Sequence, residues 1–272
     1  MSKGTQQTIL SVVCAVALAL TFFASGLVTC CLPITTQVLA GATCAHDVSP
    51  FTQDELIRAA EATRSYTVDE HDEEALYAAL WEINERAAAE GRALAGAPDL
   101  AAARGGADAG ARPDVEAIKG AFAGASESYV LPAGAVAHLD DVSDVIARFT
   151  PALLGIAVLA AFCLMATLRL YGARPVGRAL TWAGAGTLAA LLLLGLWALI
   201  GFDGFFAAFH GLFFADGTWT FPSDSLLICM YPTAFWMGMG GVWLATSCAL
   251  SILSLALGLH MLKRRDPKTD ER

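Results

Sequence analysis

Four stretches of the chain contain no Asp, Glu, Lys or Arg, and each is long enough to cross a bilayer. They cover residues 4–45, 149–168, 179–202 and 225–262. About 20 apolar residues in a helix span the hydrocarbon layer, so the pattern predicts membrane helices near residues 9–32, 150–170, 179–201 and 237–262. The predicted fold class is an all-α integral membrane protein with four transmembrane helices and a helical extracytoplasmic insertion between the first two.

The insertion, residues 33–149, contains several predicted helices. A helix over residues 51–64 has Thr52 as its N-cap and Glu55 three residues later, which together form a capping box. A second helix, over residues 74–90, carries apolar side chains at the spacing of a buried stripe, namely Leu76, Leu80, Ile83 and Ala87. Helical order is expected again at residues 115–122 and 135–148, and the last of these should end before Pro151, where the second span begins.

The segment between these helices is different in composition. Residues 92–113 are mostly Ala and Gly, with no large apolar residue after Leu100. Such a segment has little to bury, and it is predicted to be a flexible, solvated tether.

Aromatic residues are concentrated after the third span. Ten of the 34 residues from Asp203 to Trp236 are Phe, Trp or Tyr. An interfacial belt needs only a few rings, so residues 205–215 are predicted to form a short apolar helix at the outer leaflet. The predicted organisation is a first membrane helix (1–32), an extracytoplasmic domain (33–149), two membrane helices (150–201), an aromatic outer loop (202–236), and a fourth helix with a basic cytoplasmic tail (237–272).

Charge gives the orientation and excludes some classes of protein. The chain is 56% hydrophobic and 16% charged, unlike a soluble domain, and its net charge of -9 argues against binding nucleic acid. Residues 33–148 carry 20 acidic and 8 basic residues. Basic residues near helix ends stay in the cytoplasm, and nine lie on the opposite side: Lys3, Arg169, Arg174, Arg178, Lys263, Arg264, Arg265, Lys268 and Arg272. The prediction is a multi-pass cell-membrane protein with both termini inside and residues 33–149 and 202–236 outside. A cleavable signal at the first span is the alternative.

The seven cysteines include no CxxC pair and no Cys/His spacing that suits zinc. No structural metal site is predicted. Four of them map to the outer side, where the spacing leaves a disulfide and its connectivity open: Cys30, Cys31, Cys44 and Cys229.

Two of the five histidines have unusual surroundings. His138 lies in a predicted helix with Asp141 at i+3, close enough to orient an imidazole. His210 lies among aromatic residues, where a polar ring needs a partner or a function. The pattern leaves three roles open: a catalytic pair, structural or interfacial residues, or metal ligands with nearby carboxylates. The other three histidines fit bland roles, with His46 in a loop, His71 in a solvated charged turn and His260 at a membrane interface.

Three strings around these histidines resemble the bacterial lipoprotein intramolecular transacylases, the Lit family. They are AHLDDVSDV at residues 137–145, FHGLFF at 209–214 and GTWTFPSDSLLICMYPTAFW at 217–236. The resemblance is close from His138 to the last span, loose at the first span and absent from the tether. It implies an enzyme that moves the sn-2 acyl chain of a diacylglyceryl-cysteine lipoprotein onto its N-terminal amine, which gives the lyso form.

The resemblance also implies that His138 and His210 are the catalytic residues. A neutral imidazole can accept the proton of the amine and return one to the leaving oxygen, so neither a covalent acyl-enzyme nor a cofactor nor a metal is required. We expect His210 to be the acid/base group and His138 its partner, although the roles could be reversed. Asp141 would orient an imidazole, while Trp219, Asp224 and Tyr231 would line the site or serve as loop scaffolding.

Two other functions remain open at this point. One is a different outer-leaflet lipid-modifying enzyme, such as a hydrolase that uses water in place of an amine. The other is a non-enzymatic membrane protein whose acidic outer domain binds a partner. For a transacylase, the expected partners are a diacylated lipoprotein substrate and the surrounding membrane lipids. For another lipid-modifying enzyme, they are a lipid substrate and the membrane lipids.

Overall fold

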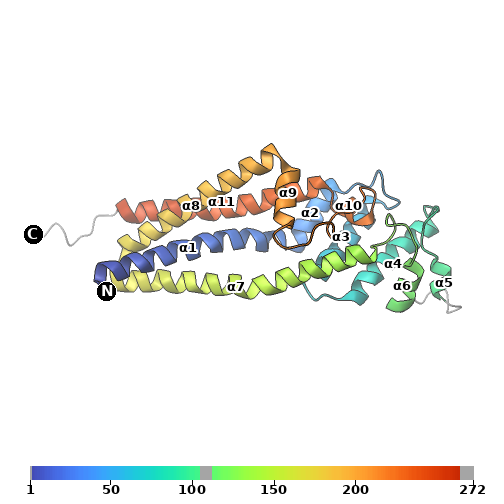
Figure 1. The fold of residues 1–272 in the computed structure, drawn as a ribbon, viewed down its shortest axis with the longest axis horizontal. Coiled ribbons are helices and arrows are strands. Elements are labelled where there is room, and N and C mark those ends of the chain that lie inside the picture. The colour runs from blue at the N-terminus through green and yellow to red at the C-terminus, as the bar shows by residue number, and fades with distance from the viewer. Residues whose placement is uncertain (1, 105–111, 264–272) are drawn as a thin grey trace, which may run out of the picture. The chain divides into compact units, whose positions relative to one another are not determined.

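The computed structural model describes residues 2–104 and 112–263, and every regular element in these ranges is an α-helix (Figure 1). The predicted all-α fold is confirmed. The helices are α1 (Lys3–Cys30), α2 (Pro33–Thr43), α3 (Gln53–Val68), α4 (Glu73–Ala89), α5 (Leu100–Arg104), α6 (Val115–Phe122), α7 (Ala133–Tyr171), α8 (Ala173–Ile200), α9 (Phe202–His210), α10 (Leu226–Met230) and α11 (Thr233–Lys263).

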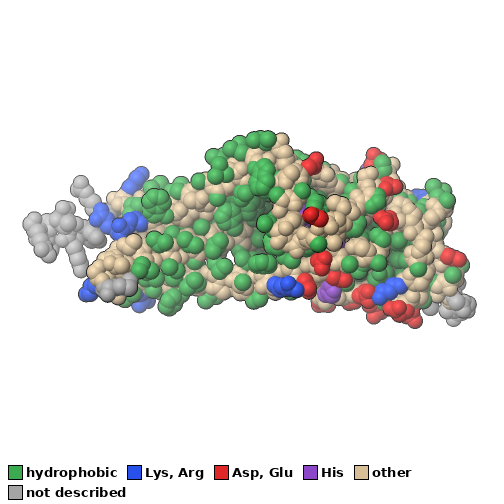
Figure 2. All heavy atoms as spheres, in the orientation of Figure 1, with side chains coloured by type: hydrophobic (Ala, Val, Ile, Leu, Met, Phe, Trp, Pro, Cys, Tyr) green, Lys and Arg blue, Asp and Glu red, His purple; other side chains and the backbone are tan. Residues whose placement is uncertain are grey.

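The chain divides into two compact units. The first consists of Met1–Cys30, Arg148–Phe206 and Gly240–Arg272, and the second of Cys31–Ala147 and Ala207–Met239. Four helices, α1, α7, α8 and α11, are long and apolar enough to cross a membrane. The prediction of four spans is therefore confirmed. In the first unit the visible surface is largely hydrophobic (Figure 2), as expected for side chains that face lipid.

Close helix packing in the first unit depends on small residues. A Cβ atom on Gly184 of α8 would lie 2.4 Å from the carbonyl oxygen of Ser251 on α11, so only glycine fits there. The Ser254 hydroxyl of α11 also donates a hydrogen bond to the Leu180 carbonyl at 2.9 Å. A side chain of α11 bonds to a backbone carbonyl of α1 in the same way, since Trp243 Nε1 donates to the Phe23 carbonyl at 3.1 Å. Polar groups bonded in this way are satisfied without water.

The second unit is built around α3 and α4. The predicted capping box is confirmed, since the Thr52 hydroxyl accepts from the backbone N–H of Glu55 and the Glu55 carboxylate accepts from that of Thr52. The apolar stripe of α4 is buried as predicted, with Leu76 and Leu80 fully inaccessible. On the visible face, acidic side chains gather on this unit (Figure 2).

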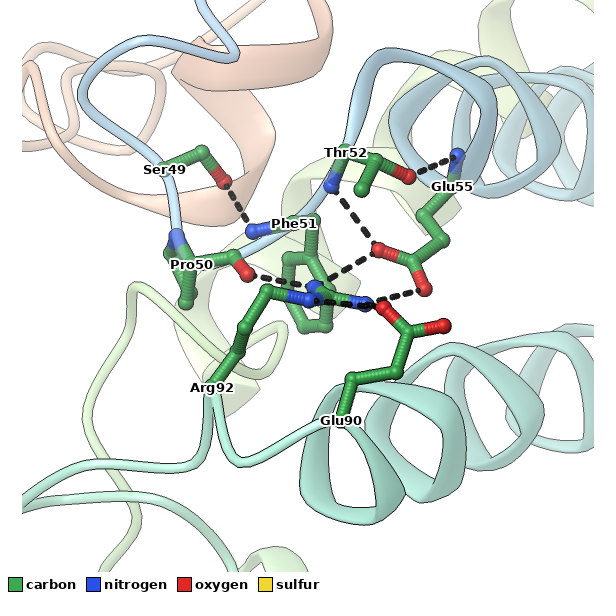
Figure 3. Close-up of polar contacts among 7 residues, drawn as sticks. All are labelled: Ser49, Pro50, Phe51, Thr52, Glu55, Glu90 and Arg92. Carbon is green, nitrogen blue, oxygen red and sulfur yellow. Dashed lines mark hydrogen bonds and ion pairs between the residues drawn. The ribbon is translucent and has the colours of Figure 1, made fainter.

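Glu55 has a second partner that the sequence pattern did not reveal. Its side chain is fully buried, and its two oxygens accept hydrogen bonds from Arg92 at 2.8 and 2.9 Å (Figure 3). Arg92 also donates to the Pro50 carbonyl at 2.7 Å and pairs with Glu90 at 2.9 Å. Burial by itself would raise the pKa of Glu55, but the hydrogen bonds from Arg92 and Thr52 outweigh it and lower the pKa. The carboxylate is therefore charged and paired.

The expected tether is wrong for residues 92–104. In addition to Arg92, the backbone N–H of Leu94 donates to the Tyr129 hydroxyl at 2.9 Å, and that hydroxyl donates to the Arg92 carbonyl. Leu100 of α5 packs on the core, and Arg104 lies over the ring of Trp81. The prediction assumed that the small alanine side chains of this segment have too little apolar surface to bury. A short helix of small residues can nevertheless approach a core closely, and Ala97 and Ala103 pack against it. Residues 105–111, including the rest of the predicted tether, lie outside the described residues.

Two predicted boundaries also differ. The helix over residues 135–148 does not end at Pro151, because α7 runs unbroken through that proline. A proline removes one backbone N–H donor, a loss that apolar membrane helices tolerate. The helix expected over residues 205–215 is instead α9, which ends at His210. All seven cysteines are free thiols.

Candidate active site

His138 and His210 lie side by side in the second unit, although 71 residues separate them in the sequence. Their rings are stacked, with 6.2 Å between centroids and 29° between planes. His138 lies in the second turn of α7, and His210 is the last residue of α9. Both are buried, with 9% and 7% of their surface exposed. The structure therefore brings together the two histidines that the sequence singled out.

The turn after α9 folds an aromatic segment over the pair. The backbone N–H groups of Phe213 and Phe214 donate to the His210 carbonyl at 3.0 and 2.9 Å and close a turn. Phe214 then lies with its ring 4.9 Å from that of His138 and 5.7 Å from that of His210. The turn therefore places Phe214 beside both imidazoles.

Two more rings complete an aromatic cage around the imidazoles. The ring of Trp219 lies 4.8 Å from that of His210, and the ring of Phe221 lies 6.0 Å from that of His138. Sequence reasoning named Trp219 but missed Phe214 and Phe221 as site residues. Their position within the motif strings FHGLFF and GTWTF was the signal that could have found them.

One ring nitrogen of His138 makes no hydrogen bond within the part of the chain that the structure describes. Its Nδ1 atom is buried and finds no hydrogen-bond partner among the described residues. Burial lowers the pKa of His138, and the neighbouring His210 lowers it further, while the charge of Asp141 has a weaker raising effect. The imidazole is therefore neutral near pH 7. A buried, neutral nitrogen without a partner is suited to accept a proton from a bound molecule.

The other predicted site residues lie in varied positions. Asp141 is exposed and makes no hydrogen bond with His138, so its effect on the imidazole is through charge. Asp224 is exposed and precedes Ser225, the N-cap of α10. Tyr231 is buried, and its hydroxyl donates to the Ala60 carbonyl at 2.5 Å, away from the cage.

His71 is more constrained than a solvated turn would be. Its ring stacks on Tyr66 with 4.2 Å between centroids, and its Nε2 lies 3.5 Å from an oxygen of Asp140. Its backbone φ is 54°, a left-handed conformation that non-glycine residues rarely adopt. The predicted turn is present and the ring of His71 is partly exposed, but the ring is held in place by its contacts with Tyr66 and Asp140.

No group of three or more His, Cys, Asp or Glu side chains within the described ranges is arranged to hold a metal ion. The cage is instead apolar around two imidazoles. Such surroundings are chemically suited to hydrocarbon or an ester next to a proton acceptor.

The fold and the site together define a polytopic helical membrane protein with a histidine pair in an aromatic cage. Residues 125–236 match the family model described as lipoprotein intramolecular transacylase Lit. This segment contains both histidines and all the cage residues.

Solved structures show the same fold. The structure of the membrane integral lipoprotein intramolecular transacylase Lit from Bacillus cereus is similar with a TM-score of 0.67 at 16% identity, covering 96% of this chain and 98% of that one. A variant of that protein in which a histidine is replaced by alanine gives a TM-score of 0.55, also at 16% identity, over 96% of each chain. No match is found among curated protein sequences.

Proposed function

We propose that this protein is a lipoprotein intramolecular acyltransferase that moves the sn-2 acyl chain of a diacylglyceryl-cysteine lipoprotein to its N-terminal amine. The observation that carries the proposal is the buried histidine pair with its unpartnered Nδ1, inside the segment that matches the Lit family model. The aromatic cage supports it as well, because the substrate brings acyl chains to the reacting atoms.

The reaction needs two proton transfers. The amine nitrogen attacks the ester carbonyl carbon, a C–N bond forms, the C–O bond to the sn-2 oxygen breaks, and that oxygen leaves as a hydroxyl. We assign the first proton to His138, because its Nδ1 is free to accept it. The proton that His138 has accepted then passes to the leaving oxygen, directly or through His210, which can also stabilise the developing oxyanion. This assignment reverses the preference drawn from the sequence.

Positioning supplies much of the remaining acceleration. The amine and the ester belong to one molecule, and a well-aligned intramolecular attack can lower the barrier by up to about 7–11 kcal/mol. The cage residues Phe214, Trp219 and Phe221 would hold the acyl chains so that the ester faces the imidazoles. The proposed chemistry uses neither a metal nor a cofactor.

We also propose that both termini are cytoplasmic and that residues 33–149 and 202–236 are outside, where lipoproteins are acylated. Nine basic residues on the opposite side support this orientation. Reporter fusions at Ala107 and Lys268, both outside the described residues, should report outside and inside. A cytoplasmic Ala107 would put the site on the wrong leaflet.

Mass spectrometry of lipoprotein N-termini, with and without this gene, tests the function. An N-acylated lyso product that requires the gene supports the proposal. Loss of acyl chain without N-acylation would indicate a hydrolase instead, and no change would favour a partner-binding role for the acidic outer domain.

A further inference from the structure

A polar cluster lies on α7 close to His138 but outside the cage. The Tyr66 hydroxyl of α3 donates a hydrogen bond to Asp140 Oδ1 of α7 at 2.6 Å. His71, from the turn between α3 and α4, places its Nε2 3.5 Å from the same oxygen and its Nδ1 3.1 Å from the Tyr66 carbonyl. One carboxylate oxygen therefore joins α3, this turn and α7.

The position of Asp140 on the helix links this cluster to the site. Asp140 follows His138 by two residues, and two residues of an α-helix are about 200° apart around its axis. The two side chains therefore leave opposite faces of α7. His138 faces the cage, and Asp140 is held by Tyr66 on the far side.

A contact on the far face of α7 opposes rotation of the helix about its axis. An imidazole lies roughly 6 Å from the helix axis, so a rotation of about 10° moves it by about 1 Å. A displacement of that size at a reacting group can lower the rate by about 10²-fold. The hydrogen bond on the far face resists this rotation.

The backbone at His71 indicates that the cluster is over-determined. A left-handed φ persists at a non-glycine residue only where surrounding contacts hold it. His71 has such contacts at both ring nitrogens and along its face. Burial raises the pKa of Tyr66, and the hydrogen bond to Asp140 raises it further, so the phenol stays protonated as a donor.

We propose that Tyr66 and Asp140, with His71 stacked over the tyrosine, are positioning residues that set the rotation of α7 and so aim His138 at its substrate. The inference rests on the proposed function in one respect, namely that His138 takes part in acyl transfer. The positioning itself is measurable without that assumption.

The test uses the full-length protein in detergent or nanodiscs with a synthetic diacylated lipopeptide. Tyr66→Phe removes only the hydroxyl, and Asp140→Ala removes the acceptor. Each should lower kcat by about 10- to 100-fold and change KM by less than about threefold, because the chemistry is misaligned while binding is retained. Asp140→Asn keeps an oxygen that can accept from Tyr66, so it should restore most of the lost rate. Tyr77→Phe is the matched control, since the hydroxyl of Tyr77 makes no described hydrogen bond.

A second measurement reports on His138 directly. Carbethoxylation by diethyl pyrocarbonate, followed by mass spectrometry, should be faster at His138 in Tyr66→Phe and Asp140→Ala than in the parent protein. Exposed His46 provides the internal reference. If His138 is modified faster in the two variants than in the parent protein, but the parent protein transfers no acyl group, the proposed function fails and the positioning stands. If kcat is unchanged in folded Tyr66→Phe, or falls while the modification rate of His138 does not change, the positioning proposal is overturned.

Discussion

Removing the Arg92 side chain should destabilise the second unit strongly. Glu55 is fully buried, and Arg92 supplies hydrogen bonds to both of its oxygens. Breaking a buried ion pair by removing one partner typically costs about 3–5 kcal/mol, because the remaining charge is buried without compensation. Arg92 is itself 25% exposed, so water can reach part of the site. We therefore expect Arg92→Ala to lower the free energy of unfolding by about 3 kcal/mol.

The pH dependence gives this prediction a sign. The pKa of Glu55 is lowered in the folded protein, so the ion pair stabilises the parent above the unfolded pKa of a glutamate, about 4.3, and this contribution is lost as pH falls through the folded value. In Arg92→Ala the buried carboxyl instead favours its proton. The difference in stability between parent and variant should therefore shrink as the pH falls from 7 to 4.

Thermal unfolding in detergent, followed by circular dichroism or intrinsic fluorescence, measures the effect. At about 2–4 °C per kcal/mol for a chain of this size, Arg92→Ala should lower Tm by roughly 6–12 °C at pH 7. Arg86→Ala, which removes an exposed arginine near the end of α4, is the control and should change Tm by less than about 2 °C. Adding Glu55→Gln to Arg92→Ala should recover part of the loss. Equal Tm values for the two arginine variants would refute the reasoning.

Three more predictions address the site and its surroundings. His138→Ala and His210→Ala should each lower acyl transfer by about 10²–10⁴-fold in the lipopeptide assay, with the double variant little worse than either and His46→Ala close to the parent. Because the pKa of His138 is lowered, kcat/KM should fall only at a pH below the usual range for histidine titration, and a loss already complete at pH 7 would contradict this. Replacing residues 94–104 by a Gly/Ser linker should lower stability by about 1–3 kcal/mol, whereas unchanged melting would restore the tether interpretation.

Local signals in the sequence were enough to predict much of the fold. The four apolar stretches and the capping box of Thr52 and Glu55 depend only on composition and short spacing, and both are present in the structure. The two histidines were found because their surroundings in the sequence are unusual.

The remaining features depend on contacts between distant residues. The partners Tyr66 and Asp140 are 74 positions apart, and Glu55 and Arg92 are 37 apart. No periodicity in one segment encodes such pairs. The same holds for Phe214 and Phe221, whose rings lie beside that of His138 although they are 76 and 83 positions away in the sequence. The tether prediction fails for residues 92–104 because composition reports what a segment could bury, whereas packing depends on what lies next to it.

The left-handed backbone at His71 has a consequence for protein engineering. A glycine at this position would adopt the same φ without steric cost and could gain on the order of 1 kcal/mol. A screen for thermostable variants could therefore select His71→Gly, which removes the ring that stacks on Tyr66 and contacts Asp140. Any gain from the relieved backbone would come with the loss of the stacking on Tyr66 and of the contact with Asp140, so α7 would be held less firmly. Thermostabilised versions of this protein should consequently keep His71 fixed.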